Sequence, residues 1–251
     1  MSHWSNIRYD YRGAHVLVTG GTSGIGAGIA AAYREAGAEV SITGTRAAAK
    51  DYPQDLSGMR YLQLNLTDKA QIAAVAGALG KLDILVNNAG ANFMLQDEYD
   101  PDIFDKGLQV NLASAYRMAQ SCKALLSASK LEGGASLIGI ASLTSFFGLE
   151  VVPAYGAAKA GLVQLTKTLG IAWAKDNIRV NSVAAGVTES RMTAQMLKVP
   201  AMMAPILART PLKRHGVPAD VAGAVLFLTS AAAGFITGQT LLVDGGYSVV
   251  G

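Results

Sequence analysis

Short apolar runs rich in β-branched residues alternate with longer alanine-rich stretches along most of the 251 residues. This alternation constrains the fold more than any other feature, because strands that take turns with helices form βαβ units and a parallel sheet. Most of the apolar runs are continuous rather than alternating, which is typical of strands covered by helices on both faces. The sequence therefore predicts a single α/β domain over residues 1–251, with a doubly wound sheet of seven parallel strands and helices on both faces.

The elements can be placed from these runs, and no low-complexity linker divides the chain. In a sheet of this kind the ligand crevice lies at the carboxyl ends of the strands. Strands are expected at residues 15–20, 39–44, 59–66, 82–90, 135–142, 178–186 and 240–246. Helices are expected at about 24–35, 69–79, 101–129, 154–175, 193–208 and 218–229.

Composition argues against several classes of protein. Half of the residues are hydrophobic (51%) and only 16% are charged, which argues against a disordered chain. The 21 basic and 18 acidic residues are scattered, so nucleic-acid binding is not expected. Cys122 is the single cysteine and cannot form an internal disulfide, so we interpret it as a buried thiol in a reducing compartment. No metal site is expected.

Two segments were considered as membrane or export signals. The N-terminal residues are polar and lack the apolar core of a signal peptide. The longest uncharged run, residues 221–243, contains threonine, serine, glycine and glutamine, which divide it into a helix, a turn and a strand. We therefore expect a cytoplasmic protein with no membrane partner.

A glycine-rich stretch, "TGGTSGIG", follows the first expected strand directly. Gly20, Gly24 and Gly26 would allow a tight turn in which backbone N–H groups and a helix N-terminus approach a pyrophosphate. The spacing differs from the commoner Gly-x-Gly-x-x-Gly, and a glycine cluster can also be only a tight turn. Its place between the first strand and the first helix favours a dinucleotide site.

The end of the second strand bears on which dinucleotide is bound. An acidic residue there bonds the ribose 2′-hydroxyl of NAD and repels a 2′-phosphate. Here Gly44 takes that place and is followed by Thr45 and Arg46, whose guanidinium could pair with a phosphate. NADP is therefore favoured and NAD is the alternative, since Arg46 could also be a solvated loop residue.

The stretch "YGAAKAG" places Tyr155 four residues before Lys159 among small residues. On a helix these two side chains would share a face, and a nearby cation lowers the pKa of a phenol. Such a tyrosine could give and take a proton near neutral pH. A surface helix with an ordinary tyrosine and lysine remains the alternative for the isolated pattern.

Together the motifs resemble the short-chain dehydrogenase/reductase family, close to its 3-oxoacyl-carrier-protein reductases and secondary-alcohol dehydrogenases. The glycine-rich stretch, "NNAG" at residues 87–90, "VNL" with Asn111, Ser142, "YGAAK" and "ITGQTLLVDGG" occur in family order. The resemblance implies a Rossmann-type fold, Tyr155 as general acid/base, and Lys159 as the group that lowers its pKa and holds the nicotinamide ribose. It also implies that Ser142 orients the substrate oxygen and that Asn111 supports a proton-relaying water.

The same resemblance implies a set of cofactor-binding residues. The chain departs from the family pattern where Ala185 replaces a proline and Ser190 replaces a threonine that bonds the nicotinamide carboxamide, and where Asn65 replaces an aspartate that contacts adenine. The implied set is Gly20, Thr22, Ser23, Gly24, Ile25, Gly26, Thr45, Arg46, Asn65, Leu66, Asn88, Ala89, Gly90, Tyr155, Lys159, Gly186, Val187 and Ser190.

The substrate is expected to be a small apolar ketone or secondary alcohol. A methionine-rich segment follows Ser190, at the place where the family has its substrate lid. The alternative is a helix that packs on the protein's own core. The expected pocket residues are Phe93, Met94, Ser142, Phe146, Met192 and Met196.

Two other functions stay open. A carrier-protein-dependent reductase would need a basic patch beside the pocket, for which Arg117, Lys123 and Lys130 are the candidates. A catalytically silent nucleotide-binding regulator would have no need for Ser142, Tyr155 and Lys159 together. The resemblance also implies a homotetramer.

Overall fold

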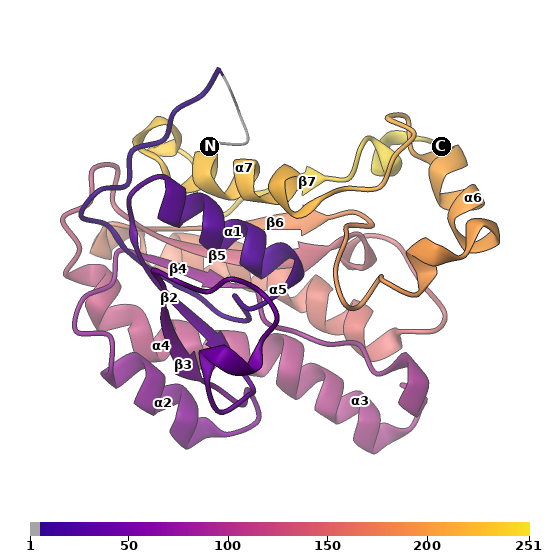
Figure 1. The fold of residues 1–251 in the computed structure, drawn as a ribbon, viewed down its shortest axis with the longest axis horizontal. Helices are drawn as coiled ribbons and strands as arrows, with labels where there is room; N and C mark the ends of the chain where they lie inside the picture. Colours follow the sequence, from indigo (N-terminus) through magenta and orange to yellow (C-terminus); the bar gives the residue numbers. More distant parts are fainter. Residues whose placement is uncertain (1–5) are drawn as a thin grey trace.

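Seven parallel strands form one sheet in the computed structural model, which describes residues 6–251 (Figure 1). The strand order is β3-β2-β1-β4-β5-β6-β7, so the order reverses between β1 and β4. At such a reversal the crossovers leave on opposite faces and open a crevice at the carboxyl ends of the strands. The strands are β1 (His15–Val18), β2 (Glu39–Gly44), β3 (Arg60–Gln63), β4 (Ile84–Asn87), β5 (Ala135–Ser142), β6 (Ile178–Ala185) and β7 (Thr240–Val243).

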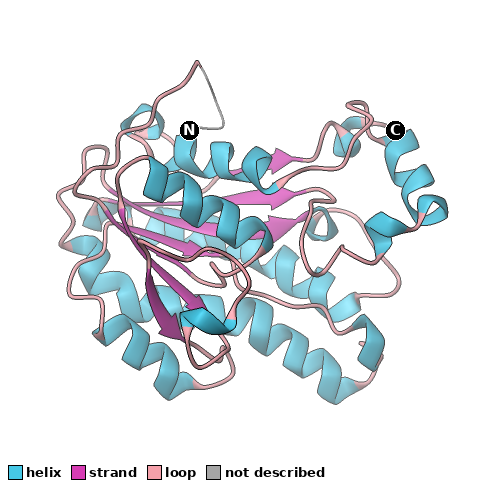
Figure 2. Ribbon diagram, in the orientation of Figure 1, coloured by secondary structure: helices cyan, strands magenta, loops and turns pink. Residues whose placement is uncertain are grey.

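Helices cover both faces of the sheet, as predicted (Figure 2). One layer holds α1 (Gly24–Glu35) and α7 (Pro218–Thr229); the other holds α2 (Lys69–Gly77), α4 (Ser114–Ser127) and α5 (Pro153–Ala172), with α3 (Pro101–Leu108) beside α5. Helix α6 (Pro200–Arg209) lies beyond the strand ends, near the C-terminus. Short 3₁₀ turns lie at Ala49–Asp51, Met94–Gln96, Leu143–Ser145, Ala174–Asp176, Met196–Lys198, Ala231–Ala233 and Tyr247–Val249.

The core is divided by the sheet, and β1 shows why. Val16 and Val18 pack with the side chains under α1 and α7, whereas Leu17 between them packs with those under α2 and α4. Successive strand residues point to opposite faces, so a strand buried on both sides must be apolar throughout. This explains the continuous apolar runs.

Two predicted helices differ from the structure by more than three residues, and those predicted at 69–79 and 154–175 end two and three residues earlier than expected. The helix expected at 101–129 is interrupted by a π-helical segment, Gln109–Ala113, between α3 and α4. The helix expected at 193–208 begins only at Pro200, because the proline ring keeps Val199 in an extended conformation (φ −108°, ψ 101°). The bounds predicted for α1 and α7 are confirmed.

The uncharged run at 221–243 forms most of α7, a turn and β7, as predicted. Within residues 6–251, no helix combines the length and the apolar character needed to cross a membrane. Cys122 is a buried free thiol, and burial raises its pKa to about 12.

Candidate active site

The glycine-rich turn lies between β1 and α1, at the carboxyl edge of the sheet. Gly20 and Gly24 have positive φ angles of 64° and 53°, which glycine adopts without strain. A Cβ on Gly26 would lie 2.3 Å from the carbonyl oxygen of Gly20, so only glycine fits there. Ser23 precedes α1 and its side chain does not cap the helix. The first N–H groups of α1 therefore have no side-chain cap, and an uncapped helix N-terminus after a glycine-rich turn suits a pyrophosphate.

The "NNAG" loop after β4 is hydrogen-bonded to this turn. The side-chain amide of Asn88 donates to the carbonyl oxygens of Thr19 (2.9 Å) and Gly20 (3.2 Å). The hydroxyl of Thr19 accepts from the backbone N–H groups of Asn88 (3.0 Å) and Ala89 (3.1 Å). Thr19 was not among the predicted site residues, because its role depends on a contact between β1 and β4, which are neighbours in the sheet but far apart in the sequence.

At the end of β2, Tyr52 and Tyr61 contact Arg46, the residue predicted to bind the 2′-phosphate of NADP. The guanidinium carbon of Arg46 lies 4.9 Å from the centre of the Tyr52 ring, and a guanidinium N–H donates to the Asp51 carbonyl. The backbone N–H of Arg46 donates to the Tyr52 hydroxyl (2.9 Å), and Tyr61 donates to the Arg46 carbonyl. A Cβ on Gly44 would lie 2.4 Å from the Tyr52 hydroxyl. Tyr52 therefore occupies the space that an acidic side chain at position 44 would need.

Ser142, Tyr155 and Lys159 come together at the end of β5. Ser142 is the last residue of β5, and Tyr155 and Lys159 lie in the first two turns of α5. The Ser142 hydroxyl lies near the Tyr155 phenol, and its hydrogen-bonding effect lowers the pKa of that phenol. Lys159 is only 3% exposed, its ammonium donates to the carbonyl oxygen of Ile140 (2.6 Å), and burial lowers its pKa to about 8.

The acidity of Tyr155 differs from the prediction. Burial raises its pKa, the hydrogen bond from Ser142 offsets part of this, and the negative charge of Glu98 raises it further. The net shift is upward, so the expectation that Lys159 lowers this pKa is wrong for the arrangement seen here. The reason is that burial is the largest influence on this pKa, while the Lys159 ammonium donates to the Ile140 carbonyl.

Asn111 lies in the π-helical segment and is buried. Its amide donates to the carbonyl oxygens of Ala91 (2.7 Å) and Gly107 (2.9 Å), and its side-chain oxygen accepts from the Ala91 N–H (3.0 Å). A Cβ on Gly90 would lie 2.5 Å from that oxygen and 3.6 Å from the Lys159 nitrogen. Asn111 and Lys159 thus meet across Gly90, which has no side chain to separate them.

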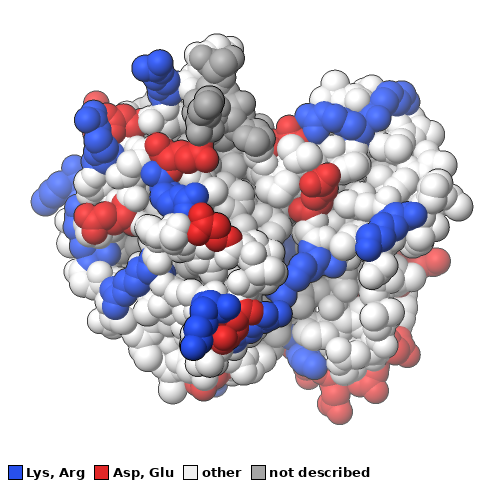
Figure 3. Space-filling view, in the orientation of Figure 1, with Lys and Arg blue, Asp and Glu red and all other residues white. Residues whose placement is uncertain are grey.

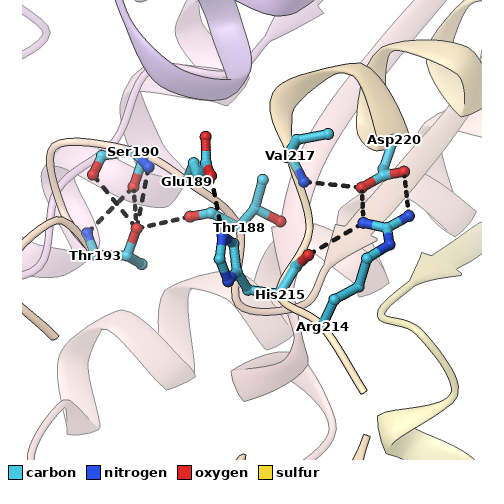
Figure 4. A network of polar contacts seen from close by, with 8 residues as sticks. All are labelled: Thr188, Glu189, Ser190, Thr193, Arg214, His215, Val217 and Asp220. Carbon is cyan, nitrogen blue, oxygen red and sulfur yellow. Dashed lines mark hydrogen bonds and ion pairs between the residues drawn. The ribbon is translucent and has the colours of Figure 1, made fainter. Parts of the chain in front are cut away.

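The loop after β6 is held by a hydroxyl network (Figure 4). The hydroxyl of Thr193 donates to the Thr188 carbonyl (2.6 Å) and accepts from the Ser190 N–H (3.0 Å). Glu189 pairs with His215 at 2.9 Å, which ties the loop to the segment before α7. A Cβ on Gly24 would lie 3.0 Å from the Cβ of Ser190, so the loop reaches the glycine-rich turn. Thr193 was not predicted.

The other predicted cofactor residues differ in exposure. Thr22 is buried, Thr45 is exposed, and the exposed Asn65 accepts from the N–H and the hydroxyl of Thr67. A Cβ on Gly186 would lie 2.8 Å from the Cα of Asp244, so this turn needs glycine although the family proline is missing. Ile25, Leu66, Ala89 and Val187 are partly buried.

Several of the apolar side chains predicted for the substrate pocket are exposed. Met94, Phe146 and Met192 are each exposed by 45–46%, and Phe93 and Met196 are partly buried. A cavity of about 90 Å³ lies beside Gly186, and its lining includes Leu143, which follows Ser142, and the polar Arg214 and Asp244. None of the six predicted pocket residues lines this cavity.

Two of the three basic residues proposed for a carrier protein, Lys123 and Lys130, lie away from this site, whereas Arg117 lies in the first turn of α4. Lys123 pairs with Asp176 (2.9 Å) just before β6 begins, and Lys130 follows Ser129, which bonds Asp83 just before β4 begins. Both lysines therefore lie at the amino-terminal edge of the sheet, opposite the candidate site. Figure 3 shows basic and acidic side chains interspersed on a hollowed face rather than a patch of one sign.

A family model described as enoyl-(acyl carrier protein) reductase matches residues 20–248. The chain is also 35% identical over 243 residues to 3alpha-hydroxysteroid dehydrogenase of Mediterraneibacter gnavus, covering 91% of this chain and 94% of that protein. The chain belongs to the short-chain dehydrogenase/reductase family. As a member it is an NAD(P)-dependent oxidoreductase that acts on CH–OH groups.

Other members of the short-chain dehydrogenase/reductase family resemble the chain to a similar degree. The 2-dehydro-3-deoxy-D-gluconate 5-dehydrogenase of Escherichia coli is 32% identical over 249 residues, covering 95% of this chain and 97% of that protein. The structure of the Pseudomonas aeruginosa RhlG/NADP active-site complex has a TM-score of 0.85 and 32% identity, and covers 95% of this chain and 97% of that one. The family assignment confirms the resemblance inferred from the motifs.

Proposed function

We propose that the protein transfers hydride between NADP and an apolar ketone or secondary alcohol, with Tyr155 giving or taking the proton. The observation that carries this proposal is the meeting of Ser142, Tyr155 and Lys159 at the end of β5. When bound, the cofactor supplies or accepts the hydride, and the protein supplies position and electrostatics. A hydroxyl pair beside the substrate oxygen can neutralise charge there as it develops.

Proton transfer follows from the groups around Tyr155. Its raised pKa keeps the phenol protonated at neutral pH, which suits donation to the oxygen of a ketone. Ser142 orients that oxygen, and Lys159, with a pKa of about 8, can pass a proton onward from its buried position. In the oxidative direction the phenol must act as a base, so oxidation is expected to be faster at higher pH.

Cofactor binding is proposed for the turns at the same edge of the sheet. The glycine-rich turn holds the pyrophosphate, Asn65 and Leu66 border the adenine, and Gly186, Val187 and Ser190 hold the carboxamide. Arg46 pairs with the 2′-phosphate of NADP, and its stacking on Tyr52 keeps the guanidinium at the end of β2. NAD remains the alternative cofactor, since Arg46 is exposed and a relative is named as NAD-dependent.

The apolar substrate class is supported by the exposed Met94, Phe146 and Met192. The relatives are named for a steroid, glycerol and a sugar acid, so the family alone leaves the substrate open. A carrier-protein substrate gains little support from the positions of Lys123 and Lys130. We further propose a cytoplasmic homotetramer of one domain, on the strength of the family resemblance and the single buried thiol.

One screen tests the proposal. The purified protein is mixed with deuterium-labelled NADPH or NADH and a panel of steroid, alicyclic and sugar-acid ketones, and deuterium in the alcohol products is measured by mass spectrometry. We expect label in apolar products and faster transfer from NADPH. Label only in sugar acids would overturn the substrate class, and no label in any product would favour a silent regulator.

A further inference from the structure

Glu98 is a buried carboxylate in the loop between β4 and α3. Its residue is only 1% exposed, which is unusual for a charged side chain. Its two oxygens accept hydrogen bonds from two backbone N–H groups: Oε1 from Phe93 at 2.6 Å and Oε2 from Tyr155 at 2.9 Å. Because both bonds join backbone groups to an ionised acceptor, they belong to the stronger class of hydrogen bond.

The bond to Tyr155 meets a need of helix α5. The first N–H groups of any helix have no partner within it, and a side chain at the N-cap usually accepts one of them. Here the N-cap is Val152, which has no acceptor in its side chain, and Pro153 follows it. Glu98 therefore caps the helix from a distant loop, and its negative charge lies at the positive end of the α5 dipole.

The bond to Phe93 fixes the other side of the site. Phe93 and Met94 lie in the loop after β4, and the same loop is held at Ala91 by Asn111. One carboxylate thus joins the expected substrate loop to the first turn of the helix that carries Tyr155. A small displacement of either partner would be felt by the other.

We propose that Glu98 is a positioning residue, which holds the Tyr155 phenol and the substrate loop at Phe93 in register for proton transfer. This inference rests on the proposed role of Tyr155 as the general acid/base. Glu98 acts through the backbone N–H of Tyr155 and not by contact with the reacting atoms.

The charge of Glu98 provides a readout that packing alone would not. Among residues 6–251, the charged groups near Tyr155 are Glu98 from the loop and Lys159 from its own helix, and Ser142 of β5 is neutral. Glu98 contributes to the raised pKa of Tyr155, so removing its charge should lower that pKa. The midpoint of the pH–activity profile should then move to lower pH, both for ketone reduction and for alcohol oxidation.

Glu98→Gln is the main test, because glutamine keeps the volume but loses the charge and one of the two acceptors. Glu98→Asp keeps the charge on a shorter side chain. Glu150→Gln is the matched control, since Glu150 is exposed three residues before α5 and loses the same charge. For each variant kcat is measured against pH with the best ketone and alcohol of the screen, and cofactor Kd by fluorescence.

We expect Glu98→Gln to lower kcat about tenfold and to move the pH midpoint downward, with cofactor Kd within about twofold. Glu98→Asp should keep the wild-type midpoint at a reduced kcat, and the control should match wild type. An unchanged midpoint in folded Glu98→Gln would overturn the proposal; if that variant does not fold, wild-type kcat in Glu98→Asp would do so. Turnover retained in Tyr155→Phe would instead refute the proposed role of Tyr155.

Discussion

The ammonium nitrogen of Lys159 lies 5.5 Å from the centre of the Tyr155 ring, one turn further along α5. The two groups are buried together, but burial shifts them in opposite directions: the pKa of the phenol rises and that of the ammonium falls to about 8. Both shifts favour the uncharged form, as expected where water is scarce. The pair is therefore a neutral phenol and an ammonium that is easily discharged.

Replacing Tyr155 with phenylalanine tests whether the phenol transfers the proton. Phenylalanine keeps the ring beside Lys159 and removes only the hydroxyl that lies near Ser142. General acid/base catalysis contributes about 10²- to 10⁴-fold, so kcat should fall by at least about 10²-fold. Cofactor Kd, measured by fluorescence, should stay near wild type. Activity within a few-fold of wild type would end the acid/base assignment.

Replacing Arg46 with alanine tests the choice of cofactor. A hydrogen-bonded ion pair to phosphate is worth about 1.5–3 kcal/mol, so NADP should bind roughly 10- to 100-fold more weakly while NAD binds as before. Lys50→Ala is the control, because Lys50 is an exposed cation four residues after Arg46, in the turn Ala49–Asp51. Equal loss of affinity for both cofactors, measured by calorimetry, would show that Arg46 supports the loop and does not select the phosphate.

Much of the fold was predictable because it depends on local patterns. The bounds of α1 and α7 follow from glycine, proline and apolar spacing, and the parallel sheet brings the ends of β1, β4 and β5 to one edge. Ser142 and Tyr155 could therefore be expected to meet. The methionine-rich pattern at 193–208 predicts a continuous helix, whereas Pro200 holds Val199 extended and delays the start of α6.

Other parts of the site could not be predicted from one sequence. Glu98 bonds a residue 57 positions away, and the Thr19 hydroxyl accepts from Asn88, 69 positions away. Neither residue belongs to a local pattern that signals its partner. The π-helical segment that holds Asn111 likewise depends on tertiary contacts with Ala91. The direction of the Tyr155 pKa shift was missed for the same reason, because it is set by burial.

The lowered pKa of Lys159 predicts how stability depends on pH. Between about 8 and the ordinary value of 10.5 the unfolded chain carries a proton on this lysine that the folded chain lacks. Since the unfolded state binds more protons, the contribution of Lys159 to the free energy of unfolding rises with pH across this window. Below pH 8 the buried ammonium costs on the order of 3 kcal/mol.

Lys159→Met should therefore be more stable than wild type at pH 7, by roughly 2 kcal/mol after the hydrogen bond to Ile140 is lost. The difference should shrink as the pH rises from 8 to 10.5. Urea unfolding at several pH values measures it, and Lys167→Met, at an exposed position of the same helix, is the control. If the free energies of unfolding of wild type and Lys159→Met differ by the same amount at every pH between 8 and 10.5, the prediction is contradicted.

A pair of glycine substitutions tests the cradle at the start of α1. In Gly26→Ala the new Cβ would lie 2.3 Å from the Gly20 carbonyl oxygen and 2.4 Å from the Asn88 amide nitrogen. Both neighbours are held by the hydrogen bond that joins them, so the turn must shift and cofactor Kd should rise at least about tenfold. Gly77→Ala in α2 is the control, because its Cβ would meet no atom within 4 Å.

The two variants should move stability in opposite directions. Alanine is the better helix former, so Gly77→Ala should raise the free energy of unfolding by up to about 1 kcal/mol and leave cofactor Kd unchanged. Gly26→Ala should lower it, because the clash displaces backbone that supports β1 and β4. Thermal unfolding with and without NADP separates the effects: the cofactor should raise the Tm of Gly77→Ala as in wild type and that of Gly26→Ala much less. An equal rise in Tm for both variants would show that the turn does not cradle the pyrophosphate.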